Sequence, residues 1–146
     1  MHVRKFQEYL DRRAAPLTLT LELVAIDWGN TWNNNNNLVT VVVNGTKIIE
    51  QNNIRSEVNT SITYSGSASV PSAPFTTKLH EPIRLMMKIV SKGMWDGDAG
   101  QGIYDRKVED LDGYRIALEG DGHKNFAVFR VAGLPAEPSL PAWGTP

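Results

Sequence analysis

The stretch LTLTLELVAI, residues 17–26, decides the fold of this chain. Leucines occupy positions 17, 19, 21 and 23, and Thr18, Thr20 and Glu22 stand between them. Successive side chains of a β-strand point to opposite faces, so a spacing of two places the leucines on one face. The stretch therefore predicts a strand with one buried face, which Ala25 continues.

Weaker versions of this pattern recur along the chain, and the segments predicted as strands are 38–43, 47–50, 58–64, 83–90, 114–118 and 126–131. Asn44-Gly45 is a strong two-residue turn signal, so residues 38–50 are predicted to form a hairpin. Residues 28–37 and 92–105 are predicted as loops. About seven or eight short strands with almost no helix predict an all-β fold, an antiparallel β-sandwich with a short N-terminal helix.

The two ends of the chain differ from its middle. Val3, Phe6 and Leu10 have helical spacing, and Ala14-Ala15-Pro16 ends that pattern. Four prolines follow Leu134 and begin no new element. The predicted organisation is therefore a helix and linker over 1–16, a β-sandwich domain over 17–133, and a proline-rich tail over 134–146.

Composition excludes several classes of protein. The 146 residues contain no cysteine, which excludes disulfides and cysteine-ligated metals. A net charge of −1 offers no basic field, which argues against a nucleic-acid partner. The N-terminal residues lack the apolar run of a signal peptide, and no stretch is long and apolar enough to span a membrane. A cytoplasmic protein is expected, with export by another route left open.

The sequence favours a protein that is not an enzyme. His2, His80 and His123 lie on three different segments, and no Gly-x-Ser-x-Gly elbow or Walker phosphate loop is present. The histidines have no metal-ligand spacing either. We therefore expect no catalytic residues.

The acidic stretch MWDGDAGQGIYD, residues 94–105, raises the question of a cation site. It fails as an EF-hand, because Gly100 and Lys107 stand where that motif has oxygen ligands. Calcium can instead be held by carboxylates from two loops at one end of a sandwich, since it accepts six to eight oxygens in flexible geometry. The alternative interpretation is a solvated acidic turn whose glycines allow positive φ.

From residue 17 to 133, the order of features resembles a C-two domain, the calcium- and phospholipid-binding sandwich of protein kinase C and synaptotagmin. Residues 19–26 form a strand ending at Asp27, an Asn-rich loop follows, and residues 37–41 open the next strand. Residues 85–90 then form a strand, followed by Asp96 and Asp98, a glycine, and Ile103.

The resemblance implies a non-enzymatic module that binds or docks onto membrane lipid or protein, with calcium as its only cofactor. The implied calcium ligands are Asp27, Asp96 and Asp98, joined by Asp105 or Asn37. The chain departs from the family in three places. Asn37 replaces the second family aspartate, and Ser91 and Gly93 stand where loop carboxylates belong. Fewer carboxylates imply weaker calcium binding, and many members of the family have lost calcium altogether.

Tryptophans supply a competing hypothesis. Trp28, Trp32 and Trp95 all fall in the two predicted loops. Exposed aromatic rings stack on sugar faces or enter a membrane interface, so a carbohydrate-binding jelly roll is an alternative function. The competing interpretation is that Trp28 and Trp95 cap the core beneath the loops. A third hypothesis is a structural subunit of a viral, phage or secretion assembly, a homo-oligomer held by its terminal helix and proline-rich tail.

Overall fold

The computed structural model describes residues 2–93 and 96–135. The elements in chain order are α1 (His2–Ala14), β1 (Pro16–Trp28), β2 (Asn34–Val43), β3 (Thr46–Ser56), β4 (Thr60–Thr63), η1 (Gly66–Ala68), β5 (Phe75–Lys78), β6 (Pro82–Ser91), β7 (Gly97–Lys107), η2 (Val108–Asp110), β8 (Arg115–Gly120) and β9 (His123–Ala132). The prediction of an antiparallel all-β fold with a short N-terminal helix is confirmed, with nine strands in the described residues. The predicted proline-rich tail lies outside the described residues from position 136 on.

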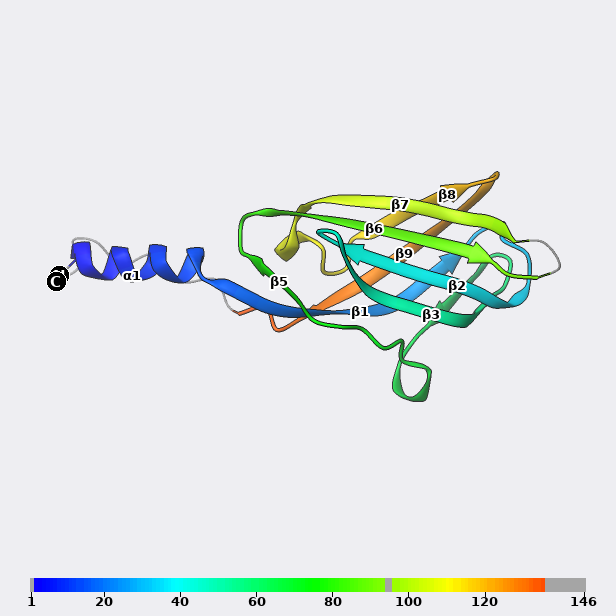
Figure 1. Cartoon of the computed structure of the whole chain (residues 1–146), viewed down its shortest axis with the longest axis horizontal. Helices are drawn as coiled ribbons and strands as arrows, with labels where there is room; N and C mark the ends of the chain where they lie inside the picture. The colour runs from blue at the N-terminus through cyan, green and yellow to red at the C-terminus, as the bar shows by residue number, and fades with distance from the viewer. Residues whose placement is uncertain (1, 94–95, 136–146) are drawn as a thin grey trace.

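The strands form one sheet in the order β3-β2-β6-β7-β8-β9-β1-β4, and β5 also pairs with β1. The two outermost strands, β3 and β4, are consecutive in the chain and joined only by residues 57–59. A link of this length spans at most about 14 Å, so the two edges of the sheet must approach each other there. The sheet therefore curls until its two halves face one another across the core, as a sandwich does (Figure 1).

The core lies between the two halves and is built by alternation along the strands. The buried apolar side chains of β1, β2 and β6 are Leu19, Leu21, Leu23, Ile26, Trp28, Val39, Val41, Val43, Ile83, Leu85, Met87 and Ile89. The leucine pattern of residues 17–26 is thus the inner face of β1. A register shift between Leu23 and Ala25 then moves Ile26 and Trp28 inward, where the sequence predicted Ala25. Such bulges insert one residue and change which side chains face the core.

Residues 97–105, predicted as part of a loop, belong to strand β7 instead. Its glycines are required by the neighbouring strand. A Cβ at Gly102 would lie 2.1 Å from the carbonyl oxygen of Ala117, and one at Gly100 would lie 2.8 Å from that of Leu118. Gly100 also has a backbone φ of +130°, which residues with a side chain rarely adopt. The glycines that resemble a loop in the sequence are therefore places where β8 passes close to β7.

The helix α1 stands apart from the sheet and leads into the first residues of β1 (Figure 1). Among the described residues, no helix combines the length and the apolar character that a membrane crossing needs. At the opposite end of the sheet, four connections lie together, and we call this the loop end. It consists of residues 29–33, 57–59, 92–96 and 121–122, apart from 94 and 95, which are not described.

Candidate functional site

A buried amide holds the loop end together. Asn125, on β9, is fully buried and donates through Nδ2 to the Thr31 hydroxyl at 2.8 Å and to the Ala99 carbonyl at 2.7 Å. Its Oδ1 accepts the Gly29 backbone N–H at 2.9 Å. One side chain thus connects the β1–β2 loop, β7 and β9. A buried amide satisfied in this way fixes the backbone around it.

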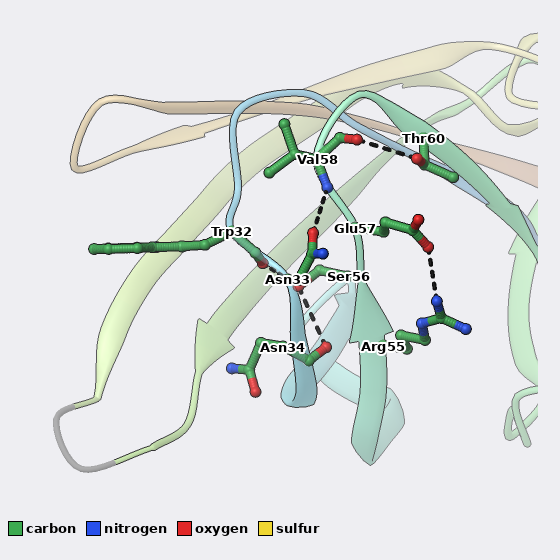
Figure 2. Close-up of polar contacts among 8 residues, drawn as sticks. All are labelled: Trp32, Asn33, Asn34, Arg55, Ser56, Glu57, Val58 and Thr60. Atoms are coloured by element: carbon green, nitrogen blue, oxygen red, sulfur yellow. Dashed lines mark hydrogen bonds and ion pairs between the residues drawn. The ribbon is translucent and has the colours of Figure 1, made fainter.

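A second buried amide, Asn37 on β2, has a similar function. Its Nδ2 donates to the Ile54 carbonyl at 2.8 Å and to the Ser56 hydroxyl at 2.9 Å. Its Oδ1 accepts the Ser91 hydroxyl at 3.0 Å. Ser56 in turn donates to the Trp32 carbonyl at 2.8 Å, which anchors the backbone of that tryptophan to β3 (Figure 2). We call the buried Asn125, Thr31, Asn37 and Ser56, together with the half-buried Ser91, the buried polar layer.

Above this layer lies an exposed one. The Trp32 side chain is 67% exposed and extends to the side opposite Arg55 and Glu57 (Figure 2). Its ring lies 6.1 Å from that of His123, at an angle of 39°. Asn33 accepts the Val58 N–H through Oδ1 at 3.0 Å, and Asn34 donates through Nδ2 to the Ser91 hydroxyl at 2.9 Å. The Asn-rich segment therefore has an ordered backbone that presents polar groups beside an aromatic ring.

Two open clefts flank this segment and share Asn33 and Asn34. The first, of about 440 Å³, is lined by Trp32, Asn33, Asn34, Ser91, Lys92, Gly93, Gly97, Asp98, Asp121 and His123. The second, of about 650 Å³, is lined by Asn33, Asn34, Asn35, Arg55 and Ser56. Their charged side chains balance, because Arg55 and Lys92 stand against Asp98 and Asp121. The surface is thus polar without a strong field of either sign, with Trp32 as its apolar part.

The predicted calcium ligands are dispersed, and most have another partner. Asp27 lies 3.1 Å from Arg115, Asp96 lies 3.0 Å from Lys92, and Asp98 accepts the Gly100 N–H at 2.9 Å. Asp105 lies on β7 opposite Arg84, away from the loop end. The oxygen of Asn37 already accepts the Ser91 hydroxyl. Among residues 2–93 and 96–135, no three His, Asp or Glu side chains are grouped so that they could hold a metal.

The three tryptophans separate in the structure. Trp28 is only 2% exposed and belongs to the core, as the competing interpretation expected. Tyr64 packs nearby, and burial raises the pKa of its phenol to about 12, partly offset by the Trp28 side chain. Trp95 lies outside the described residues. Trp32 is therefore the predicted platform residue that the structure describes at the surface.

Sequence reasoning missed Asp121 and His123 as residues of this surface. The position of both residues on the cleft that Trp32 lines depends on β9 pairing with β1. Asn125 and Thr31 were also missed, since their hydrogen bonds join positions 94 residues apart. No local signal in the sequence identifies these contacts.

Neither a family model nor a curated protein matches this sequence. Among solved structures, the chain is similar to a 2.0 Å structure of a C-two domain, the one designated A, of plant Extended Synaptotagmin 1. The match covers 86% of this chain and 100% of that one, with 9% sequence identity and a TM-score of 0.41. That domain is of the kind that the sequence resembles. A likeness of this size carries no argument about function, so the proposals below rest on the residues of this chain.

Proposed function

We propose that this chain is a non-enzymatic binding module that binds carbohydrate at its loop end, with Trp32 as the platform. The observation that carries the proposal is the 67% exposure of an indole whose backbone carbonyl is fixed by Ser56. Exposing a large aromatic ring on an anchored backbone has no evident benefit for folding. It does supply a rigid apolar surface, which lowers the entropy lost on binding.

The side chains around Trp32 suit a sugar. The C–H face of a pyranose ring packs on an aromatic face, and its hydroxyls need both donors and acceptors. Asn33 retains an Nδ2 donor, because its described hydrogen bond uses Oδ1. Asp98 and Asp121 supply acceptors on one side, and Arg55 supplies donors on the other. The first cleft thus places acceptors beside the platform, and the second, which Trp32 does not line, offers further polar contacts across Asn33 and Asn34.

The charge balance of the clefts argues against an anionic membrane as the ligand. Binding to acidic lipids needs an excess of lysine and arginine near the surface. Here Arg55 and Lys92 are matched by Asp98 and Asp121, and Asp96 and Glu57 add two carboxylates nearby. A neutral, hydroxyl-rich ligand fits this surface better than a phosphate-rich one.

The test is a titration of the full chain with a panel of neutral oligosaccharides, in which binding is measured by tryptophan fluorescence and by calorimetry. We expect at least one glycan to bind, and Trp32→Ala to weaken that binding at least about ten-fold, or about 1.4 kcal/mol. Met86→Ala is the matched control, since it removes an exposed apolar side chain from a different surface. A flat response across the panel, or equal binding by Trp32→Ala, would overturn the proposal.

Calcium-dependent binding to membrane lipid or protein is the second candidate. It is favoured by the position of Asp98 and Asp121 on the same cleft, since Asp98 is close in sequence to Asp96. Calorimetry with calcium tests it, with Asp96→Ala and Asp98→Ala as variants. Asp96→Ala is the cleaner of the two, because Asp98 also accepts the Gly100 N–H. Absence of heat, with no shift of the thermal midpoint at millimolar calcium, counts against this candidate.

A further inference from the structure

The outer face of β2, β6 and β7 carries a row of apolar side chains. Val42 pairs with Met86, and Met86 pairs with Ile103, so the three lie side by side across the strands. Met86 is 47% exposed and Ile103 is 53% exposed. They line a shallow, mostly apolar cleft of about 570 Å³, with Thr40, Met87, Lys88, Gln101 and Gly102. The helix α1 lies well away from these strands (Figure 1).

Polar side chains border this row on β6 and β7. The outward positions before and after Met86 on β6 are Arg84 and Lys88, and those around Ile103 on β7 are Gln101 and Asp105. An exposed sheet face normally alternates polar residues outward and apolar residues inward. A contiguous apolar patch with a polar rim is typical of a protein interaction site, and methionine adapts readily to such contacts.

The charges beside the row indicate which partner fits. Arg84 and Asp105 are directly opposite each other on β6 and β7, in the row next to Met86 and Ile103. Within the part of the chain that the structure describes, no ion pair joins either of them to another side chain. A face that carries a cation and an anion side by side in this way is complementary in charge to the same face of a second copy.

We propose that this face binds the same face of a second copy of the chain. A two-fold axis parallel to the strands, running between β6 and β7, places β6 of each copy over β7 of the other. Met86 then meets Ile103 of the second copy, and Arg84 meets Asp105 of the second copy. Both contacts occur twice, as an isologous interface requires. Two sheets packed in this way lie about 10 Å apart, within reach of these side chains.

The charge pattern selects a second copy over other occupants. A membrane surface disfavours a carboxylate such as Asp105 beside the apolar row. The charge pattern of this face is complementary to itself, so a second copy matches it, whereas an unrelated protein would need a matching pattern of its own. The inference is independent of the carbohydrate proposal, since the loop end and this face share no residue. Trp32→Ala therefore serves as a control that leaves association unchanged.

The experiment is sedimentation equilibrium of the full chain and of two charge variants, Arg84→Asp and Asp105→Arg. Each variant alone brings like charges together across the interface, so we expect its association to be at least about ten-fold weaker than that of the unsubstituted chain. Mixing the two variants restores opposite charges at both contacts. We therefore expect the mixture to associate within a few-fold of the unsubstituted chain.

Restoration on mixing separates the interface from any folding defect, because a misfolded chain is not repaired by a partner. Ile103→Lys gives a second route and is expected to weaken association at least about ten-fold. An unsubstituted chain that stays monomeric at about 1 mM would overturn the proposal. So would association that Ile103→Lys leaves unchanged, or variants that stay apart when mixed.

Discussion

Asn37 and Asn125 lie beneath the loop end, and Asn33, Asn34 and Asn35 lie at its clefts, yet the two groups contribute differently. The first two are fully buried and use both donor and acceptor atoms within the protein. The other three line the two clefts, where Asn33 and Asn35 are exposed and Asn34 is half-buried, with its amide bonded to Ser91 and to the Asn36 N–H. Burial, rather than residue type, therefore decides whether an asparagine holds the fold or is available to a ligand.

The largest effect is expected where the buried polar layer is broken at its centre. Asn125→Leu leaves the Gly29 N–H and the Ala99 carbonyl without their partner, while the Thr31 hydroxyl keeps the His123 Nδ1 at 3.3 Å. Each unsatisfied buried group costs about 1–3 kcal/mol, so we expect the free energy of unfolding to fall by about 3–5 kcal/mol. Urea denaturation measures the change. Asn35→Leu is the matched control in the exposed layer, and similar losses for both variants would remove the distinction between the layers.

A smaller loss is expected at the second buried amide. Asn37→Ala removes three hydrogen bonds, but Ser56 keeps the Trp32 carbonyl and Ser91 keeps Asn34 as partners. We expect a loss of about 2–3 kcal/mol in the free energy of unfolding. The same denaturation series measures it. A loss below about 0.5 kcal/mol would mean that this amide does not hold β2 to β3.

The exposed layer should show the reverse behaviour. Trp32→Ala is expected to change the free energy of unfolding by no more than about 0.5 kcal/mol, because its side chain is mostly in water. Denaturation of this variant beside the unsubstituted chain measures that change, while its loss of glycan affinity is measured separately. A destabilisation comparable to that of Asn125→Leu would place Trp32 with the buried layer instead.

The smallest effect is expected at Asp27, the carboxylate near the end of β1. Its pairing with Arg115 is solvent-exposed, and such pairs contribute about 0–1 kcal/mol. Asp27→Asn should therefore leave stability nearly unchanged, and it should not alter glycan affinity. Thermal melts with and without calcium test this position. A calcium-induced rise of the melting temperature that Asp27→Asn abolishes would instead support a metal site there.

The sequence allowed the inner face of β1 to be predicted, since a spacing of two needs no distant information. It did not reveal the shift between Leu23 and Ala25. It also did not reveal β7 as a strand, because the glycines of β7 are required by the close approach of the β8 backbone. At the loop end, Trp32 was predicted as a binding residue from its position in a polar loop. The position of His123 beside Trp32 could not be predicted, since it depends on the pairing of strands that are far apart in the chain.

A glycan titration of the isotope-labelled chain, monitored by nuclear magnetic resonance, tests whether the buried polar layer and the exposed layer above it respond differently to a ligand. We expect the bound sugar to shift the indole N–H signal of Trp32 and the side-chain amide signals of Asn33–Asn35. The side-chain amides of Asn37 and Asn125 should keep their positions. Shifts centred on the buried amides, or no shift at the loop end with any glycan of the panel, would contradict this expectation.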